Sequence, residues 1–512
     1  MRKLLYALLP AFICCFANGQ KSKTQQLAIV LKRQVEKIHY NPRPVNDSFS
    51  ADVFRHILRD LDPHQNIFVS DDFISLSAYR YKLDDELNGG EWKFLDHLTS
   101  LYGLRLKKAD SLVESILQKP LDLTIDEKIT FGKKDGFHFG PANELRVRWT
   151  KWFRFLLLNT LYDIYETDAS KPGFKVVIDK NETAVREKIK KNTRKNFLEI
   201  LDPATFDNYI KEVYLNAVAT SFDPHTNYLS IEGKEHLQSE LSTEDYSFGF
   251  EIDESKDGKL IVAQLIPGGP AWKSGEIHAN DELLQIQWVG RSPVDVSTIT
   301  YGEAYELLNQ SNHGSVFLKV RKTNGAIQSV TLQKEKIETS DNVVKGYVLK
   351  GEKNIGYISL PDFYTVWEDE KGSGCANDMA KEIIKLKREK IDGLILDVRF
   401  NVGGSLEEAL QMAGIFIDEG PLTGTRDQSG KVLFLKDPNR GTIYDGPLVL
   451  LINGQSASAS ELLAAVFQDY NRAVIVGSPS YGKATMQAIF PMDTLMRNPS
   501  APSPNGYVKI TT

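Results

Sequence analysis

Apolar positions along the chain change their spacing twice. Before about residue 235 they recur every three or four residues, as in QQLAIVLKRQVEKI and DVFRHILRDL, which predicts amphipathic helices. From about 240 to 335 they stand in short runs typical of strands. From 336 onward, longer apolar runs alternate with helical stretches, which predicts an α/β arrangement. We therefore expect a helical N-terminal domain at residues 20–235, a β domain at 240–335 and an α/β domain at 336–512.

The individual runs predict the elements of the last two domains. In the β domain we expect one short helix, TYGEAYELLNQ, and the strands FGFEID, KLIVAQLI, DELLQIQWVG, SVFLKVRK and QSVTLQKE. In the last domain we expect the strands IGYISLPDF, IDGLILDVRF, GPLVLLIN and RAVIVG, and the helices CANDMAKEIIKLKREK, SLEEALQMAGIFI and SASELLAAVFQDY. Strands that are apolar almost throughout are typical of a sheet covered on both faces, so this domain should hold the largest core.

Charge and length exclude some classes of protein. A chain of 512 residues is too long for a single core, which agrees with several domains. The net charge of −6 gives no attraction to phosphate backbones, so nucleic acid is not an expected partner. After the N-terminus no stretch approaches 18 apolar residues, so we expect no integral membrane segment in the mature chain.

The first twenty residues, MRKLLYALLPAFICCFANGQ, have the pattern of an export signal. Arg2 and Lys3 precede an apolar run of about a dozen residues, and a small-x-small cleavage pattern ends at Gly19. We therefore predict a signal peptide at 1–19 and an exported protein. Two of the three cysteines would leave with it. Only Cys375 remains, which excludes an internal disulfide, and with no histidine nearby in sequence it is expected to be a bystander.

A weak repeat joins LDPHQNIFVS to FDPHTNYLS within the helical region. Asp62 and Asp223 begin the two Asp-Pro turns, and each is expected to bond the backbone just ahead and end a helix. A role for His64 and His225 as ligands or bases is the less favoured alternative. The basic run REKIKKNTRKNF in the same region is expected to be a solvated helix face rather than a binding patch.

Three serines alternate with alanines at an expected strand-to-helix passage, in LLINGQSASASELLAAVF. The last of the nine histidines is His313, so the final 199 residues (512 minus 313) hold no histidine for a Ser-His-Asp triad. The chain also lacks His-Glu-x-x-His and Gly-x-Ser-x-Gly. Lysine remains as a base, provided that burial lowers its pKa enough to make it neutral. Lys483, in SPSYGKATMQ beside Gly482, is the candidate, and the residues alone leave open which serine it serves.

The stretches LDVRFNVGGSLEEAL and SASASELLAAVFQDYNRAVIVGSPSYGKATMQ resemble the C-terminal processing peptidases, also called tail-specific proteases. Their pattern is D-x-R-x-N-x-G-G, then S-A-S-A-S-E, then D and G-x-x-x-x-G-K-x-x-x-Q. The resemblance implies that Ser458 is the nucleophile and that Lys483, 25 residues later, is the base. It also implies that Gln487 orients the lysine and that Asp469 is an acidic position, which we expect to be structural rather than catalytic.

The same resemblance implies an oxyanion hole formed by the amide of Ala459 with that of Gly403 or Gly404. The flanking Ser456 and Ser460 are expected to cap the start of the helix, with Ser456 the better candidate. The chain departs from the family pattern at Val402 and Ala484, and neither change removes a chemical group. The ending NGYVKITT stops within an expected strand, which suggests a truncated product with an unpaired strand edge.

The middle domain resembles a PDZ domain through PGGPAWKSGEIHANDEL and the strand that follows. This resemblance implies that an extended peptide adds to a strand edge and that backbone amides of a loop bind its terminal carboxylate. The alternative is a β-barrel module that binds nothing. The stretch LRDLDPHQNIFVSDDF resembles the helical domain of the tail-specific branch. The implied fold is multidomain α+β: a helical N-terminal domain, a PDZ-like β-barrel domain and an α/β (crotonase-like spiral) peptidase core. The implied peptide-binding residues are Ser247, Phe248, Gly249 and Phe250.

The expected function is that of an exported serine endopeptidase in the periplasm or cell envelope of a bacterium, without cofactor or metal. Its expected partners are protein substrates with accessible C-terminal tails, while an adaptor protein and an oligomeric state are left open. A peptide-binding scaffold with an inactive peptidase domain is the first alternative. An acyl-CoA enzyme of similar architecture is the second, and no basic, phosphate-reading loop supports it.

Overall fold

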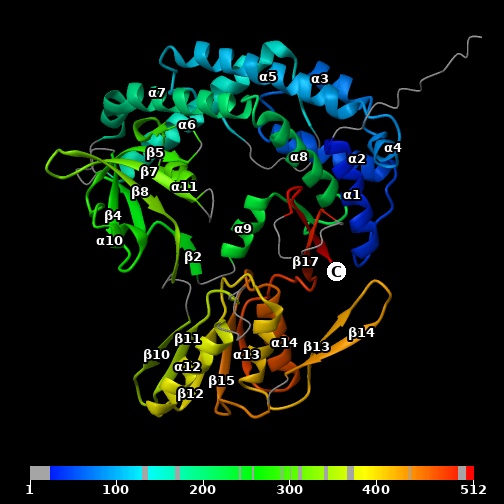
Figure 1. Cartoon of the computed structure of the whole chain (residues 1–512), viewed down its shortest axis with the longest axis vertical. Coiled ribbons are helices and arrows are strands. Elements are labelled where there is room, and N and C mark those ends of the chain that lie inside the picture. Colours follow the sequence, from blue (N-terminus) through cyan, green and yellow to red (C-terminus); the bar gives the residue numbers. More distant parts are fainter. Residues whose placement is uncertain are drawn as a thin grey trace, which may run out of the picture.

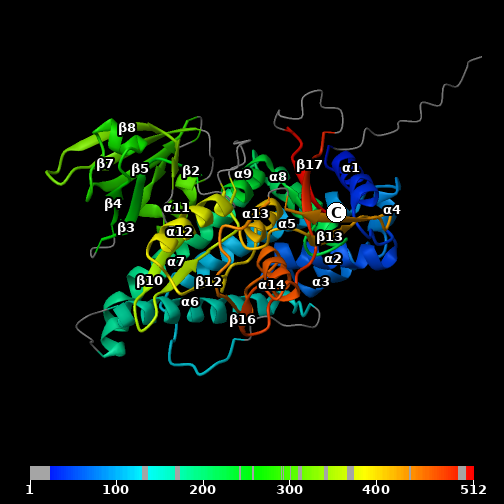
Figure 2. The same ribbon diagram turned by 90° about the horizontal axis from the view of Figure 1, so that it is seen from below.

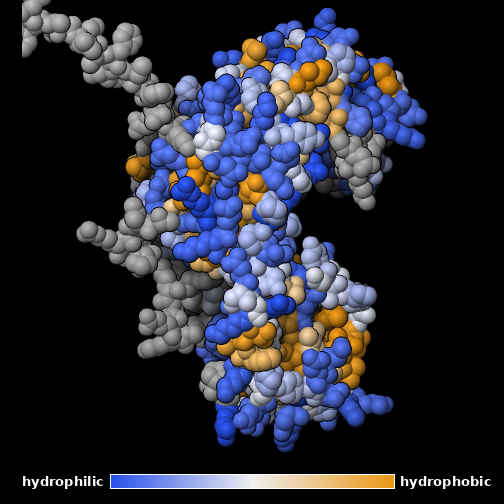
Figure 3. Space-filling model, turned by 90° about the vertical axis from the view of Figure 1, so that its right-hand side faces the viewer, coloured by the Kyte–Doolittle hydropathy of each residue, from blue (hydrophilic) through white to orange (hydrophobic). Residues whose placement is uncertain are grey.

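The computed structural model of the chain describes residues 23–129, 137–167, 173–240, 244–255, 259–289, 291, 293–299, 301–309, 314–338, 344–365, 374–437, 440–493 and 503–512. The expected signal peptide, with its two cysteines, lies outside the described residues. Figure 1 shows three parts: an arch of helices at the top, a group of strands at its left end, and a mixed sheet and helices below. Figure 3 shows the molecule indented at mid-height, between the helical part above and the sheet part below.

The N-terminal part is helical, as the spacing of its apolar residues predicts. Its core includes Phe49, Phe94, Phe153 and Tyr214, each without exposed surface. Its first elements are α1 (Lys23–Ile38), α2 (Asp47–Leu61), α3 (Ser70–Ser77), α4 (Leu83–Leu87) and α5 (Phe94–Leu117). They are followed by η1 (Ala142–Glu144), α6 (Leu145–Thr167), α7 (Phe174–Ile200), α8 (Phe206–Thr220), β1 (Asn227–Leu229) and α9 (Ile231–Glu240).

The two Asp-Pro turns are built as predicted. Asp62 follows α2, and its carboxylate accepts three backbone N–H groups at 2.8–3.0 Å, from the residues at 66–68. Asp223 follows the end of α8, and its Oδ1 accepts the N–H of His225 at 2.7 Å and that of Thr226 at 3.2 Å. Each carboxylate therefore closes the turn that ends a helix.

The middle part holds the predicted strands and the short helix. Its sheet runs in the order β3-β4-β5-β7-β8, so β3 is an edge strand, and β6 pairs with β5. The strands are β3 (Phe250–Glu254), β4 (Leu260–Leu265), β5 (Glu282–Trp288), β6 (Val294–Asp295), β7 (Ser315–Arg321) and β8 (Ile327–Gln333). The helices are α10 (Pro270–Ser274), η2 (Val296–Thr298) and α11 (Tyr301–Asn309), and β2 (Glu244–Ser247) pairs separately with β9 (Glu335–Glu338).

The last part contains a five-stranded sheet in the order β10-β11-β12-β15-β16. The last four strands of that order are parallel, and β10 is antiparallel to β11. The strands are β10 (Lys345–Leu349), β11 (Ile355–Ser359), β12 (Gly393–Asp397), β15 (Leu448–Ile452) and β16 (Val474–Gly477). The helices are α12 (Cys375–Arg388), α13 (Leu406–Gly414) and α14 (Ala459–Asp469), and β13 (Pro421–Arg426) forms a hairpin with β14 (Val432–Lys436).

The final strands do not join this sheet. Strand β18 (Tyr507–Thr511) lies between β1 and β17 (Gln487–Pro491) and pairs with both, so the prediction of an unpaired strand edge at NGYVKITT is wrong. Met492, Val508 and Ile510 belong to the same apolar cluster as the N-terminal helices. Figures 1 and 2 both show β17 beside α1. The chain therefore returns to the helical part after completing the α/β sheet.

In the part of the chain that the structure describes, no helix is long and apolar enough to cross a membrane. The same residues contain no group of three or more His, Cys, Asp or Glu side chains that could hold a metal ion.

Candidate active site

Ser458 stands at a strained turn between β15 and α14. Its backbone has φ 55° and ψ −111°, a conformation that non-glycine residues seldom adopt. Such a residue costs about 1–3 kcal/mol and persists only where its surroundings hold it. The residue is half-buried and occupies the N-cap of α14, at the positive end of the helix dipole. The predicted nucleophile therefore lies where a negative charge would be stabilised.

The two flanking serines hold this turn but do not cap the helix. Ser456 is fully buried, and its hydroxyl donates to the carbonyl of Val398 at 2.8 Å and accepts the N–H of Asn453 at 2.9 Å. Ser460 is also fully buried and donates to the carbonyl of Asn401 at 3.0 Å. The prediction that these serines cap the helix start is wrong, because both hydroxyls bond a loop far away in sequence.

Two glycines bring that loop, which follows β12, against Ser458. A Cβ on Gly403 would lie 2.9 Å from the Cβ of Ser458, and one on Gly404 would collide with the carbonyl of Phe363. The N–H of Gly403 donates to Oδ1 of Asn401 at 2.8 Å. The N–H of Gly404 has no acceptor among the described residues. Of the two glycine amides predicted for the oxyanion hole, that of Gly404 is thus the one left unbonded in the described chain.

The amide of Ala459 is the first of α14 and has no partner within the helix. A Cβ on Gly403 would lie 3.2 Å from this nitrogen, so the helix start and the glycine loop are in close contact. An unbonded amide at a helix N-terminus suits a developing oxyanion. The role of Ala459 as an oxyanion donor stays a prediction.

Lys483 lies in the loop between β16 and β17 and is half-buried. Its Nζ donates to the carbonyl of Thr485 at 2.9 Å and to Oε1 of Gln487 at 3.1 Å. Burial lowers the pKa of Lys483, and the positive charge of Lys509 lowers it further, while two nearby carboxylates act in the opposite direction. A lowered pKa is what a lysine needs in order to accept a proton near neutral pH.

One carboxylate joins the segments of the predicted nucleophile and base. Oε2 of Glu461 accepts the backbone N–H of Ser458 and that of Lys483, each at 2.8 Å, while Oε1 accepts from Gly482 N–H at 2.6 Å and Ser480 Oγ at 2.7 Å. Burial alone would raise the pKa of Glu461, but these four donors lower it below its ordinary value. Within the described residues no hydrogen bond joins Lys483 Nζ directly to Ser458 Oγ.

Glu461 is a functional residue that the sequence motifs did not single out, although it is the last residue of the run SASASE. Its place three residues after Ser458 is the spacing of a capping box, in which the third helical residue accepts the N-cap amide. That spacing was the signal that could have identified it.

The two other residues of the predicted catalytic set lie in different places. Gln487 begins β17 and contacts Lys483 directly. Asp469 is the last residue of α14 and is exposed, eleven residues from Ser458. At 1.5 Å per residue this separates the two by about 16 Å along the helix. The position of Asp469 gives it no contact with the reacting groups, and its structural role stays a prediction.

Cys375 begins α12 and is fully buried. Burial raises the pKa of its thiol well above the ordinary value, with Glu408 raising it further. A nucleophilic cysteine needs the opposite shift, so the environment favours the bystander interpretation.

The predicted peptide-binding loop of the middle part precedes the edge strand β3. Gly249 has φ 76°, and its N–H donates to Oγ of Ser247 at 3.0 Å. A Cβ on Gly249 would lie 2.9 Å from Cα of Gly269, so this close approach requires glycine. Phe248 and Phe250 are buried in the core of this part. Among the described residues no strand pairs with the outer side of β3, and that side is where an added strand would pair.

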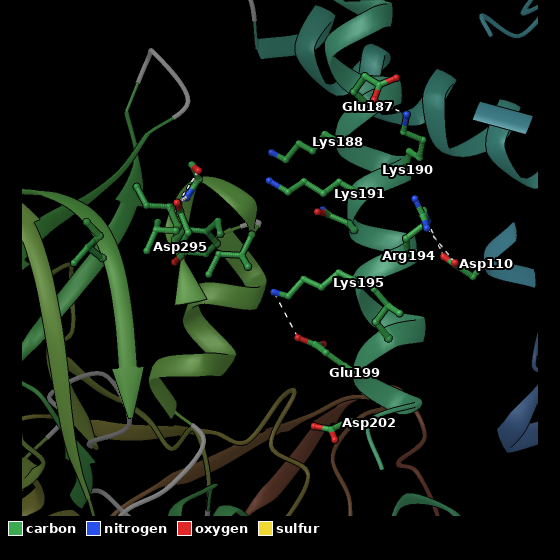
Figure 4. A pocket seen from close by; sticks show the side chains of 18 of the residues that line it. Asp110, Glu187, Lys188, Lys190, Lys191, Arg194, Lys195, Glu199, Asp202 and Asp295 are labelled. Carbon is green, nitrogen blue, oxygen red and sulfur yellow. Dashed lines mark hydrogen bonds and ion pairs between the residues drawn. The ribbon is translucent and has the colours of Figure 1, made fainter. Parts of the chain in front are cut away.

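A cavity of about 1550 Å³ separates α7 from the middle part and contains none of the predicted catalytic residues. Lys188, Lys191 and Lys195 point into it from α7, with Asp295 on the opposite side (Figure 4). Arg194, from the same basic run, instead pairs with an aspartate of α5. The run is thus helical, as predicted, but it faces neighbouring elements as well as solvent.

Three family models match successive parts of the chain. The tail specific protease N-terminal domain matches residues 31–232, the PDZ domain matches 237–321, and peptidase family S41 matches 354–511. The order of a helical domain, a PDZ domain and a peptidase core, predicted from the sequence, is confirmed.

Curated relatives carry related names. The tail-specific protease of Haemophilus influenzae is 29% identical over 480 residues, which cover 91% of this chain and 64% of that protein. The carboxy-terminal-processing protease of Bartonella bacilliformis is 29% identical over 309 residues, which cover 60% of this chain and 65% of that protein. The chain thus spans slightly less than two thirds of the length of these relatives.

Among solved structures, a photosystem II D1 C-terminal processing protease is 20% identical and has a TM-score of 0.32, covering 70% of this chain and 86% of that one. A TM-score of that size is too low to support a conclusion about this chain. From the three family models and the curated relatives, the chain belongs to the tail-specific, or C-terminal processing, peptidases, with a core of peptidase family S41.

Proposed function

We propose that this chain is a serine endopeptidase that uses Ser458 as nucleophile and Lys483 as general base. The main support for the proposal is the Glu461 carboxylate, because one of its oxygens accepts hydrogen bonds from the backbone amides of both residues at 2.8 Å. This contact brings together two residues 25 positions apart, in a domain without histidine. The lowered pKa of Lys483 supports its role as a base.

The two oxygens that accept hydrogen bonds from Lys483 Nζ also suit this chemistry. A neutral lysine has two N–H bonds and one lone pair. If the N–H groups donate to Thr485 and Gln487, as the distances of 2.9 and 3.1 Å indicate, the lone pair is left to accept a proton. In the proposed reaction Lys483 takes the proton of Ser458 Oγ while Oγ bonds to the scissile carbonyl carbon.

The amides of Ala459 and Gly404 would donate to the resulting oxyanion. The C–N bond then breaks, and the amine product leaves with the proton held by Lys483. Water then attacks the acyl carbon while it gives a proton to the same lysine. The bond from that carbon to Oγ breaks, and Lys483 returns the proton to Oγ, which releases the carboxyl product and restores Ser458.

We further propose that substrates are unfolded proteins whose C-terminal tails bind the PDZ domain along β3. Support comes from the edge position of β3 and from the names of the relatives, which refer to tail-specific or carboxy-terminal processing. We also propose export to the periplasm or cell envelope of a bacterium, on the pattern of residues 1–19. Signal cleavage after residue 19 and domain boundaries near 235–240 and 336 belong to the same proposal.

The function is tested with casein and with a tail peptide that has either a free carboxylate or an amide at its C-terminus. The parent chain should digest casein and bind only the free acid, because loop amides bind a carboxylate. Lys483→Ala should bind the peptide equally well and digest nothing. Full digestion by Lys483→Ala would overturn the dyad. Peptide binding without digestion by the parent chain would favour the scaffold alternative.

A further inference from the structure

The hydrogen bonds around Lys483 continue beyond Gln487 into the helical domain. Nε2 of Gln487 donates to Oγ1 of Thr511 on β18 at 3.1 Å. Oγ1 of Thr511 donates to Oδ1 of Asp223 at 3.3 Å, and Asp223 Oδ2 is 2.6 Å from Nε2 of His39. This series of hydrogen bonds joins the proposed base to His39, the residue that follows α1, across segments that are far apart in sequence.

The carboxylate of Asp223 fixes the direction of the hydrogen bonds that run through Thr511 and Gln487 to Lys483. An ionised carboxylate can only accept, so Thr511 must give its single proton to Asp223. The hydroxyl oxygen of Thr511 then accepts from Nε2 of Gln487, which turns Oε1 of Gln487 toward Lys483. A reversed amide would present N–H groups to the amine instead. Nε2 of Gln487 also donates to Oγ1 of Thr485 at 3.2 Å, so Asp223 sets one of the two bonds that orient the amide toward Lys483.

His39 fixes the carboxylate in turn. Nδ1 of His39 accepts the backbone N–H of Asn41 at 3.0 Å, so the neutral ring carries its proton on Nε2 and donates it to Asp223. The His39 side chain is only 6% exposed. Thr226 donates its hydroxyl to the same Oδ2 at 2.5 Å. Asp223 thus has little freedom to leave Thr511.

The turn at Asp62 shows that the side-chain hydrogen bonds to Asp223 are not needed to close an Asp-Pro turn. Asp62 begins the equivalent Asp-Pro turn, and the acceptor contacts found for it among the described residues come from three backbone amides. Asp223 accepts its turn amides and, in addition, the side chains of His39, Thr226 and Thr511. Of these additional donors, Thr511 is the one that leads through Gln487 to Lys483.

We propose that Asp223, held by His39, is a positioning residue that acts through Thr511 and Gln487 to orient the base Lys483. The helical N-terminal domain would then complete the active site rather than only enclose it. This inference rests on the proposed function, because it assumes that Lys483 is the base.

The test replaces the hydroxyl that links the two domains. Thr511→Val keeps the shape of the side chain but removes both of its bonds, so the kcat for casein or a peptide should fall about 10- to 100-fold, as expected for a misplaced catalytic group. KM and the thermal midpoint should stay close to those of the parent chain. Thr511→Ser keeps the hydroxyl and should restore most of the activity.

Thr220→Val is the control, since it removes a half-buried threonine hydroxyl at the end of α8 that contacts His56 and takes no part in the bonds leading to Lys483. Its kcat should equal that of the parent. If the parent is active and Thr511→Val has the same kcat, the positioning role is overturned. It is also overturned if Thr511→Ser or Thr220→Val loses as much kcat as Thr511→Val. An inactive parent chain would instead overturn the proposed function itself.

A pH profile separates positioning from simple support of the fold. The charged groups that face Lys483 are Glu461 of α14, Lys509 of β18 and Asp223. Asp223→Asn removes a negative charge that favours protonated Lys483, so the acid limb of kcat/KM should move to lower pH while kcat falls. Thr511→Val keeps that charge and should lower kcat without moving the limb. The proposal would be overturned if Asp223→Asn and Thr511→Val lost thermal stability but kept the kcat and the pH profile of the parent chain.

Discussion

At the scale of single residues, the site depends on a strained serine held by contacts from a distant loop. The pattern SASAS predicted the place of Ser458, but the resemblance was needed to choose it among three serines. The capping roles assigned to Ser456 and Ser460 were wrong because local propensity contains no information about buried carbonyls more than fifty residues away. Glu461 could have been found from its capping-box spacing.

Gly403→Ala should abolish most of the activity. The residue has φ 108°, and the new Cβ would lie 2.9 Å from that of Ser458, so the proposed nucleophile would have to move. We expect a fall in kcat of about 100-fold. Steady-state peptide hydrolysis measures it.

Gly430→Ala is the control for backbone strain alone, because Gly430 has φ 80° but its nearest neighbouring atom would be 3.7 Å away. That variant should keep the parent kcat. Equal activity of the two variants would show that the contact with Ser458 does not matter.

Glu461→Gln should disturb both Lys483 and Ser458, the proposed base and nucleophile. An amide cannot accept all four hydrogen bonds, and leaving donors unsatisfied costs about 1–3 kcal/mol of folding stability in addition to activity. Because the pKa of Glu461 is lowered from its ordinary 4.5, its stabilising contribution is complete above that value and is lost as the pH falls through the folded-state pKa.

Thermal midpoints of the parent and Glu461→Gln should therefore converge below about pH 4.5. The control is Glu407→Gln, an exposed first-turn glutamate of α13 whose carboxylate accepts from a glutamine side chain. A constant difference between parent and Glu461→Gln at all pH values would argue against the carboxylate role.

At the scale of elements, strong periodicity predicted most helices and strands of the last two domains. The pairing of β18 with β1 and β17 was not predicted, because it joins residues such as Tyr228 and Val508 across the length of the chain. No local pattern records such a partner. Of the features that the sequence did not predict, the pairing of β18 matters most for function, since β18 carries Lys509 and Thr511 toward Lys483.

Lys509→Met should shift the pH dependence of the reaction. The charge of Lys509 lowers the pKa of Lys483, so its removal should raise that pKa and move the acid limb of kcat/KM to higher pH. Lys436→Met, on the exposed strand β14, is the control and should leave the limb in place. A shift to lower pH, or none, would contradict the assignment of Lys483 as the titrating base.

At the scale of the whole molecule, our proposal implies that the peptidase core does not complete its own site. The proposed nucleophile, Ser458, lies at the head of α14, while the strands after Lys483 belong to the sheet that packs on the N-terminal helices (Figures 1 and 2). The three-domain order could be predicted from changes in apolar spacing. The proposed dependence of the site on the first domain could not, because it rests on contacts between segments far apart in the sequence.

Covalent labelling tests the central claim, that Ser458 is the nucleophile activated by Lys483, most directly. The parent chain is treated with a fluorophosphonate, digested and analysed by mass spectrometry. We expect a single modified peptide containing Ser458, no modification in Ser458→Ala, and labelling slowed at least tenfold in Lys483→Ala. Modification of a different residue, or equally fast labelling in Lys483→Ala, would contradict the account.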